Sequence, residues 1–133
     1  MKDAHVLFLC PHGAVKSVFG MTYFKALAEK AGLTVSVENG GTDPDKAAPP
    51  KVLATLKQEG FDLDGFVPPL LTPKKLNAAD IVFSIGCITA DQVPAGTRYI
   101  NWSDVPQFSD GFETARMSIY AHAQALVAEL QGS

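Results

Sequence analysis

The sequence predicts an α/β domain of three layers, in which a four-stranded parallel sheet carries helices on both faces. Short apolar runs, typical of buried strands, alternate along the chain with longer segments whose apolar residues recur at helical spacing. No internal repeat, low-complexity tract or change in composition divides the 133 residues. We therefore expect one domain over residues 1–133.

Two strands and two helices are expected in the first half of the chain. Residues 6–10 form a continuous apolar run, as in a parallel strand that is buried on both faces. A helix is expected over residues 16–31 and ends at Gly32, because glycine readily adopts the backbone conformation that follows a helix. The alternating residues 33–38 predict a second strand. A second helix is expected to start at Pro49 and Pro50 and to continue over residues 51–59.

Two further helices and two further strands are expected in the second half. Thr72 is a candidate N-cap for a short helix that ends near residue 77. Residues 80–85 and 97–101 predict the third and fourth strands, and residues 111–130 predict the final helix. Because ligands of parallel α/β sheets bind beyond the carboxyl ends of the strands, we expect a site at that edge.

The charge and cysteine content exclude several classes of protein. Eleven Lys and Arg against 14 Asp and Glu give a net charge of −3, which opposes general binding to nucleic acid or to an anionic membrane. The apolar stretches are too short for a membrane span or a signal peptide. Two cysteines are too few for a disulfide framework or a structural zinc site. We therefore expect a cytoplasmic protein with two free thiols and no metal or other cofactor.

A candidate anion site follows the first predicted strand, at residues 10–17. Gly13 and Ala14 allow the backbone to curl, so that successive N–H groups can point inward, and the next helix adds the positive end of its dipole. Such a loop, with Lys16 nearby, favours the thiolate form of Cys10, a nucleophile for the phosphorus or arsenic of a bound oxyanion. Equally open is that Cys10 is a buried strand-end cysteine in an ordinary turn.

Further segments follow the order of a known family. They are an Asn-Gly-Gly-Thr stretch, a helix leading to Gly-Phe-Asp, a strand ending in a cysteine, and an Arg-Tyr-Ile-Asn-Trp stretch, at residues 39–42, 52–63, 79–87 and 98–102. With Cys10, five intervening residues, Lys16 and Ser17, they resemble the low-molecular-weight protein tyrosine phosphatase superfamily, and within it the arsenate reductase branch. The resemblance implies a phosphatase-I-like fold and covers nearly the whole chain.

The resemblance also implies a chemistry for the loop. Cys10 would hydrolyse a phosphomonoester, such as phosphotyrosine, through a phosphocysteine. Ser17 would stabilise the thiolate, and an aspartate from a late loop would be the general acid. The implied partners are a phosphate, sulfate or arsenate anion or a phosphorylated substrate. The oxyanion would be bound by Pro11, His12, Gly13, Ala14, Val15 and Lys16.

Two loop positions depart from the family pattern. Lys16 replaces the family's arginine, which keeps the charge but loses the planar fork that grips two oxygens. His12 and Gly13 stand where the family has Gly-Asn, and because that asparagine braces the loop, another bond must do so here. His12 is a candidate for this brace or for a titratable donor near the anion, and it is equally well explained as a solvent-facing residue.

The general acid is also displaced. In the register set by Trp102, the family's aspartate falls near Gln107 and Phe108, which cannot usefully donate a proton. The sequence favours Asp104 as the acid, slightly above the alternative that it has no such role. Asp110 also flanks the position and could equally be the N-cap of the last helix.

Cys87 matches the first of the further cysteines that relay oxidation in the arsenate reductases, but the stretch after it supplies no partner. It could resolve an oxidised Cys10, although a packed strand-end residue is the favoured interpretation. Two alternative functions therefore remain beside the phosphatase. One is an arsenate reductase that uses Cys10 with an external thiol, and the other is a catalytically degenerate module that binds phosphate without turnover.

Overall fold

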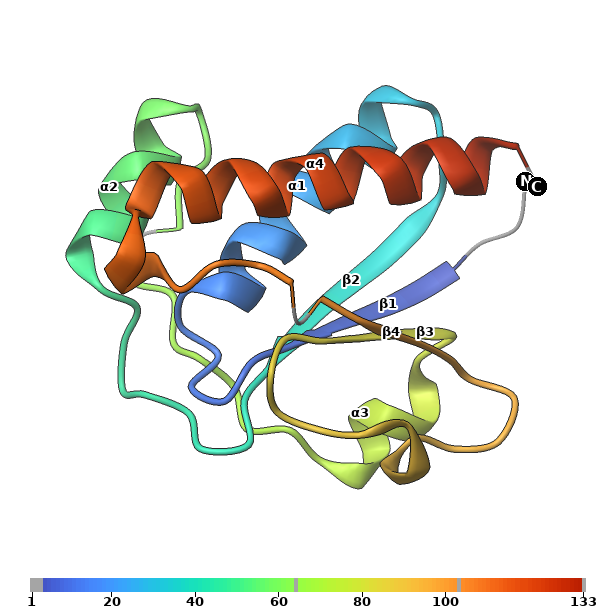
Figure 1. The fold of residues 1–133 in the computed structure, drawn as a ribbon. Coiled ribbons are helices and arrows are strands. Elements are labelled where there is room, and N and C mark those ends of the chain that lie inside the picture. The colour runs from blue at the N-terminus through green and yellow to red at the C-terminus, as the bar shows by residue number, and fades with distance from the viewer. Residues whose placement is uncertain (1–3, 64, 103, 133) are drawn as a thin grey trace.

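Within residues 4–63, 65–102 and 104–132, which the computed structural model describes, four strands form one parallel sheet (Figure 1). The strands β1, β2, β3 and β4 comprise Ala4–Leu9, Val35–Gly40, Ile81–Ser84 and Arg98–Asn101. Their spatial order is β2-β1-β3-β4, and each neighbouring pair is parallel. β1 therefore lies inside the sheet, and the segment that follows it begins at the carboxyl edge.

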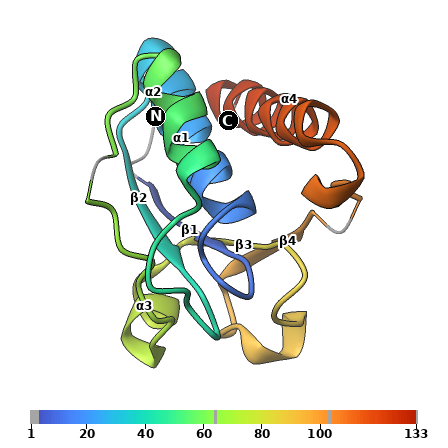
Figure 2. The same ribbon diagram turned by 90° about the vertical axis from the view of Figure 1, so that its left-hand side faces the viewer.

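Helices cover both faces of the sheet, as Figure 2 shows. The helices α1, α2 and α4 lie on one face and α3 lies on the other, and they comprise Lys16–Lys30, Pro50–Gln58, Phe112–Gln131 and Pro73–Ala78, respectively. In the part of the chain that the structure describes, no helix is long and apolar enough to cross a membrane. The predicted three-layer α/β architecture is confirmed.

The alternating side chains of β1 supply both hydrophobic cores, because successive residues of a strand point to opposite faces. Val6 and Phe8 belong to the larger core with residues of α1, α2 and α4. Leu7 and Leu9 belong to the smaller core, against which Leu76 of α3 packs. All four of these side chains are fully buried, so the strand that leads to Cys10 is held rigidly from both sides.

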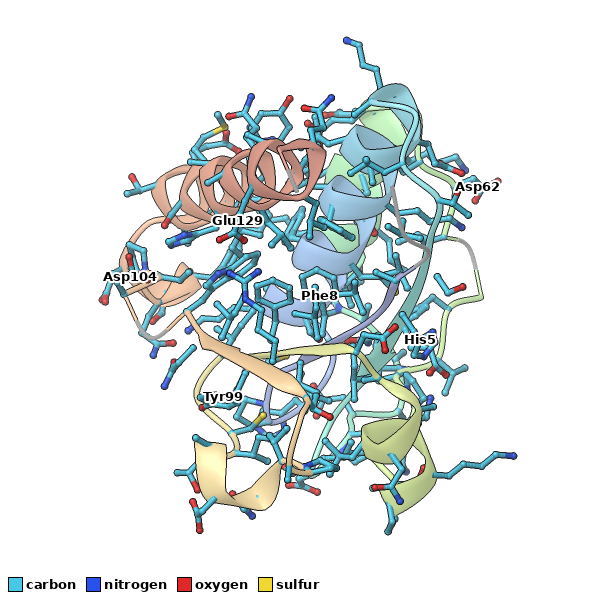
Figure 3. The ribbon with its side chains drawn as sticks, turned by 90° about the vertical axis from the view of Figure 1, so that its right-hand side faces the viewer. His5, Phe8, Asp62, Tyr99, Asp104 and Glu129 are labelled. Carbon is cyan, nitrogen blue, oxygen red and sulfur yellow. The ribbon has the colours of Figure 1, made fainter. Side chains whose placement is uncertain are left out.

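Aromatic rings in the larger core fix α1 against the sheet. Phe8 stacks on Phe83 with ring centroids 4.8 Å apart and contacts Trp102 at 5.9 Å; Figure 3 shows Phe8 between the sheet and the helices. Gly20 of α1 lies over these rings, where a Cβ atom would come within 2.9 Å of Phe8. The missing side chain lets α1 approach closely, and this helix begins at the loop after Cys10.

A hydrogen-bond network connects α1, the end of α2 and α4. The Tyr23 hydroxyl donates to Glu59 Oε1 at 2.6 Å, and Arg116 Nη1 donates to the Tyr23 hydroxyl and to Glu59 Oε2, each at 3.0 Å. Burial and, next, the bond to the Glu59 carboxylate raise the pKa of Tyr23. The network therefore connects the three helices that cover the larger core.

The second strand extends further than predicted. We expected it over residues 33–38, but β2 continues to Gly40, with Asn39 opposite Phe8 and Gly40 opposite Leu9. The composition of residues 39–44 is typical of a loop, yet pairing with β1 keeps its first two residues in the sheet. Tertiary pairing therefore overrides local preference at this point.

The last helix corrects the interpretation of Asp110 as an N-cap. The helix α4 begins at Phe112, and its N-cap is Gly111. Asp110 instead ends the short 3₁₀ turn Phe108–Asp110. The Phe108 ring of this turn stacks on the Phe19 ring, with centroids 5.4 Å apart. This aromatic contact sets where the turn lies relative to α1 and so places the residues just before it.

Candidate active site

Cys10 is the first residue after β1, and its side chain is 5% exposed. Its N–H donates to Gly40 O at 3.4 Å, which continues the β1–β2 pairing to the edge of the sheet. The chain then turns at Gly13, whose N–H donates to Cys10 O at 3.2 Å and whose φ of +60° is unfavourable for most side chains. The tight turn brings the segment straight into the first helical turn of α1.

The N-terminus of α1 lies beside Cys10 at the same pocket. Lys16 is its first residue, and the N-cap Val15 has no side-chain acceptor for the N–H groups of the first turn. Phe19 N–H is the first to be bonded back along the helix, to Val15 O at 3.0 Å. The N–H groups before it and the helix dipole favour a negative group beside Cys10.

Ser17 contacts the Cys10 sulfur directly. The Cys10 Sγ and Ser17 Oγ atoms are 3.1 Å apart, and Ser17 is fully buried. When the thiol is ionised, the hydroxyl can donate to the sulfur, because a serine hydroxyl is both a donor and an acceptor. The structure thus brings Ser17 into contact with the Cys10 sulfur, and its role in stabilising the thiolate stays a prediction.

The loop is braced by Asn39, which sequence reasoning missed. Asn39 is 3% exposed, and its Nδ2 donates to Gly13 O at 2.8 Å. The family's bracing asparagine is absent at position 13, and here an asparagine on β2 supplies the bond from the other side. The available signal was Asn39 itself, at the first position of the stretch that resembles the family's Ser-Ala-Gly-Thr.

Gly41, the residue after β2, lets the chain pass close to the loop of residues 10–17, called the anion loop below. A Cβ atom at this position would lie 2.9 Å from Gly13 N and 3.0 Å from both His12 C and Pro11 O. These are backbone atoms that cannot move aside without displacing the loop. The glycine is therefore required by a close approach of two main chains.

A second segment, residues 42–45, runs along the outside of the loop. Asp43 N–H donates to Pro11 O at 2.7 Å, and Asp45 N–H donates to His12 O at 3.1 Å. The His12 Nδ1 atom lies 3.0 Å from Asp43 O and 3.4 Å from Asp45 Oδ1. Asp45 was not among the predicted site residues, because nothing local to its sequence indicates contact with residue 12.

These segments enclose a pocket of about 260 Å³. It is lined by Cys10, Pro11, His12, Ala14, Val15, Lys16, Asp45, Ile85, Gly86 and Gln107. Most of the predicted oxyanion-binding residues therefore meet in one cavity with the thiol and Lys16. Gly13 is the exception, since it does not line the pocket and its N–H is bonded to Cys10 O.

Asp104 is not brought to this pocket, contrary to the expectation for a general acid. Its side chain is 71% exposed, and its Oδ1 lies 3.1 Å from Nε2 of His122 on α4. The His122 ring stacks on Trp102 at 4.9 Å, which holds the pair on the outer side of the sheet edge, as Figure 3 shows for Asp104. Gln107 lines the pocket instead, in agreement with the register that the sequence set from Trp102.

Cys87 lies after β3, packed against the smaller core and outside the pocket lining. Its Sγ is 3.6 Å from Ser84 Oγ, and its N–H donates to the same oxygen at 3.4 Å. Burial raises the pKa of Cys87, and the negative charge of Cys10 raises it further, against the lowering effect of the Ser84 bond. Cys87 is therefore a packed thiol whose pKa depends mainly on burial and in part on the charge of Cys10.

Over residues 4–63, 65–102 and 104–132, no group of three or more His, Cys, Asp or Glu side chains is arranged to hold a metal ion. The features assembled above define a class of protein: a parallel α/β domain with a buried cysteine at the start of the tight loop between its first strand and helix. Residues 5–102 match the low molecular weight phosphotyrosine protein phosphatases, and the chain belongs to this family. The resemblance stated from the sequence is thereby confirmed.

Two of the relatives are named for arsenate reduction. A Halobacterium salinarum protein, provisionally named an arsenate reductase, is 31% identical over 86 residues, which are 63% of this chain and 61% of that protein. The structure of a thioredoxin-dependent arsenate reductase of Corynebacterium glutamicum is 28% identical, with a TM-score of 0.80, and the match covers 96% of this chain and 62% of that one. The chain thus spans about three fifths of the length of these two relatives.

A third relative is a phosphatase of nearly equal length. The solution structure of a low molecular weight protein tyrosine phosphatase from Bacillus subtilis is 20% identical, with a TM-score of 0.77, and the match covers 97% of this chain and 98% of that one. At this identity the likeness concerns the fold, which agrees with the predicted phosphatase-I-like architecture.

Proposed function

We propose that this chain is a cysteine-dependent phosphomonoesterase with Cys10 as its nucleophile. The observation that carries the proposal is the placement of the Cys10 thiol, 3.1 Å from the Ser17 hydroxyl, in a pocket at the N-terminus of α1. In such a pocket the helix N–H groups and the Lys16 ammonium group attract the dianion of a phosphate ester. The proposal rests on this combination of nucleophile, stabilising hydroxyl and cationic anion site.

In the first step the Cys10 thiolate attacks phosphorus. A sulfur–phosphorus bond forms, the ester P–O bond breaks, and the leaving group departs with the electron pair of that bond. The loop N–H groups and Lys16 hold the remaining phosphoryl oxygens. Lys16 supplies one point charge where an arginine would grip two oxygens, so we expect the step to be slow.

In the second step water attacks the phosphocysteine. An O–P bond forms, the P–S bond breaks, and the Cys10 thiolate returns with the Ser17 hydroxyl donating to it. Inorganic phosphate is released. The proposal gives Asp104 no role in either step, because its carboxylate contacts His122 and does not line the pocket.

The test is turnover of p-nitrophenyl phosphate by the wild type, Cys10→Ser and Cys87→Ser. We expect slow hydrolysis that disappears in Cys10→Ser and persists in Cys87→Ser. The second variant is the control, because the Cys87 thiol does not line the pocket. Equal rates for the wild type and Cys10→Ser would contradict the proposal.

Arsenate reduction is a second candidate, favoured by the names of two relatives, which are 31% and 28% identical to this chain. Cys87 supplies a second thiol, whose pKa is raised mainly by burial and to a smaller extent by the charge of Cys10. Cys10 would displace hydroxide from arsenate to form an S–As bond. Attack of Cys87, or of an external thiol, on the Cys10 sulfur would then break that bond, leave its electron pair on arsenic as arsenite and form a disulfide.

Arsenite formation in the presence of arsenate and dithiothreitol tests this candidate. Formation that survives Cys10→Ser would exclude it. Loss in Cys87→Ser with retained phosphatase turnover would assign Cys87 as the resolving thiol, whereas full activity of Cys87→Ser would assign that step to the external thiol.

A further inference from the structure

His12 and Asp45 form a pair at the wall of the Cys10 pocket. Both residues line the cavity, and the His12 Nδ1 atom lies 3.4 Å from Asp45 Oδ1. The backbone holds them together, since Asp45 N–H donates to His12 O at 3.1 Å. A carboxylate beside an imidazole nitrogen orients the ring and stabilises its protonated form.

The contacts of the ring also assign its proton. Nδ1 faces two acceptors, the Asp45 carboxylate and the Asp43 carbonyl oxygen at 3.0 Å. An imidazole nitrogen between acceptors carries a hydrogen, so Nδ1 is the donor and Nε2 is the nitrogen that gains and loses a proton. His12 is 58% exposed at the pocket wall, where a proton can exchange with water or with a ligand.

The pocket needs such a group because its expected acid is missing. Gln107 lines the pocket, close to where the sequence register puts the family's aspartate, and an amide cannot transfer a proton to a leaving oxygen. Asp104 is held by His122 outside the cavity. Apart from the thiol and the ammonium group that the reaction already uses, the titratable side chains that line this pocket are those of His12 and Asp45.

We propose that His12, oriented by Asp45 and by the Asp43 carbonyl, is the proton donor to the leaving group, a role that rests on the phosphomonoesterase function proposed above. As the P–O ester bond breaks, His12 Nε2–H passes its proton to the departing oxygen and becomes neutral. In the second step neutral Nε2 accepts a proton from the attacking water, and the imidazolium returns. One proton leaves and one is regained in each turnover.

Charged groups of both signs share this wall. The Asp45 carboxylate lies beside the ring, and the Cys10 thiol and the Lys16 ammonium group line the same pocket.

The leaving group provides the test, because p-nitrophenolate departs without a proton and phenolate needs one. We compare kcat/KM for p-nitrophenyl phosphate and phenyl phosphate in the wild type, His12→Gln and Asp45→Asn. Glutamine keeps an N–H that can reach the Asp43 carbonyl but cannot transfer a proton. We expect His12→Gln to lose about 100-fold on phenyl phosphate and less than about tenfold on p-nitrophenyl phosphate. Asp45→Asn should show the same selectivity to a smaller degree.

The matched control is His122→Gln, which removes an imidazole that is paired with a carboxylate outside the pocket. It should leave both rates unchanged. The wild-type rate on phenyl phosphate should also fall at alkaline pH, and this fall should vanish in His12→Gln.

Three outcomes would overturn the assignment. Equal loss on both substrates in His12→Gln, together with weaker inhibition by inorganic phosphate, would show that His12 only shapes the loop. No loss on either substrate would show that it has no role. If Cys10→Ser turned over both substrates as fast as the wild type, the proposed phosphomonoesterase function itself would be wrong. This pattern is distinct from the other two.

Discussion

At the residue scale, Lys16 is the position where this chain departs most consequentially from its family. The side chain keeps a positive charge at the first turn of α1, beside the thiol of Cys10. An ammonium group is strongly hydrated and makes single contacts, whereas a guanidinium group binds two oxygens in a fixed plane. The same pocket can thus bind a dianion and still stabilise its transition state poorly.

Lys16→Arg should therefore raise kcat/KM for p-nitrophenyl phosphate by at least about tenfold, as expected for restoring one preorganised donor pair. The measurement is steady-state turnover, with Cys10→Ser as the background. Lys25→Arg, on an exposed position of the same helix, is the matched control and should have no effect. An unchanged rate in Lys16→Arg would mean that lysine does not limit the site and would favour a degenerate binding module.

The thiol of Cys87 gives a second prediction at this scale. Its pKa is raised by burial and then by the charge of Cys10, so its alkylation by iodoacetamide should reach half-maximal rate at a pH above that of an exposed cysteine. Cys10→Ser removes the negative charge and should move this midpoint to lower pH. Peptide mass spectrometry over a pH series measures both, and an unmoved midpoint would show that the two thiols do not interact.

At the scale of elements, the anion loop is shaped by the end of β2 as much as by its own sequence. Asn39 donates to Gly13 O, and Gly41 contributes a surface without a side chain against the same turn. Asn39 belongs to β2, which pairs with β1, and Gly41 directly follows that strand, so the sheet register sets the position of the loop. The geometry of the site therefore depends on where β2 ends.

Asn39→Ala should leave the buried Gly13 carbonyl without its partner and cost about 1–3 kcal/mol in the free energy of unfolding. Because the loop loses its brace, inhibition by inorganic phosphate should weaken about tenfold or more. Ser36→Ala, on an exposed position of the same strand, should change neither quantity. Full stability with unchanged phosphate inhibition in Asn39→Ala would show that the bond does not hold the loop.

At the scale of the whole molecule, binding and folding are coupled through the site. A ligand that binds the folded chain alone stabilises it by mass action, by about 2.7 kcal/mol at 100 times its dissociation constant. Millimolar phosphate or sulfate should therefore raise the melting temperature of the wild type, and less so that of Lys16→Ala. A melting temperature indifferent to phosphate would count against the hydrolase, the reductase and the binding module alike.

The network around Tyr23 predicts how stability depends on alkaline pH. The pKa of Tyr23 is raised by burial and by the Glu59 carboxylate, so the folded state holds the proton more tightly than the unfolded chain. This contribution is present below about pH 10, the value for unfolded tyrosine, and is lost as the pH rises toward the folded-state pKa. Urea unfolding between pH 8 and 11 should show a decline that is reduced in Tyr23→Phe but not in Tyr120→Phe.

The sequence predicted most of the elements because their signals are local. The apolar run before Cys10, the helical spacing after Lys16 and the final helix each depend on neighbouring residues, and each is found within one or two residues of its predicted bounds. The end of β2 was misplaced because its last residues, Asn39 and Gly40, have loop composition and remain extended only through pairing with β1.

The sequence by itself determined the α/β class, the anion loop after the first strand, and the register that places Gln107 where the family has its acid. Only the tertiary structure decided that Asn39 braces Gly13, that Asp45 stands beside His12, and that Asp104 is held by His122. Each of these contacts joins residues that lie at least 18 positions apart in the sequence. No local sequence pattern encodes such a contact, because it depends on how the strands pair and on which side chains then line the same pocket or surface.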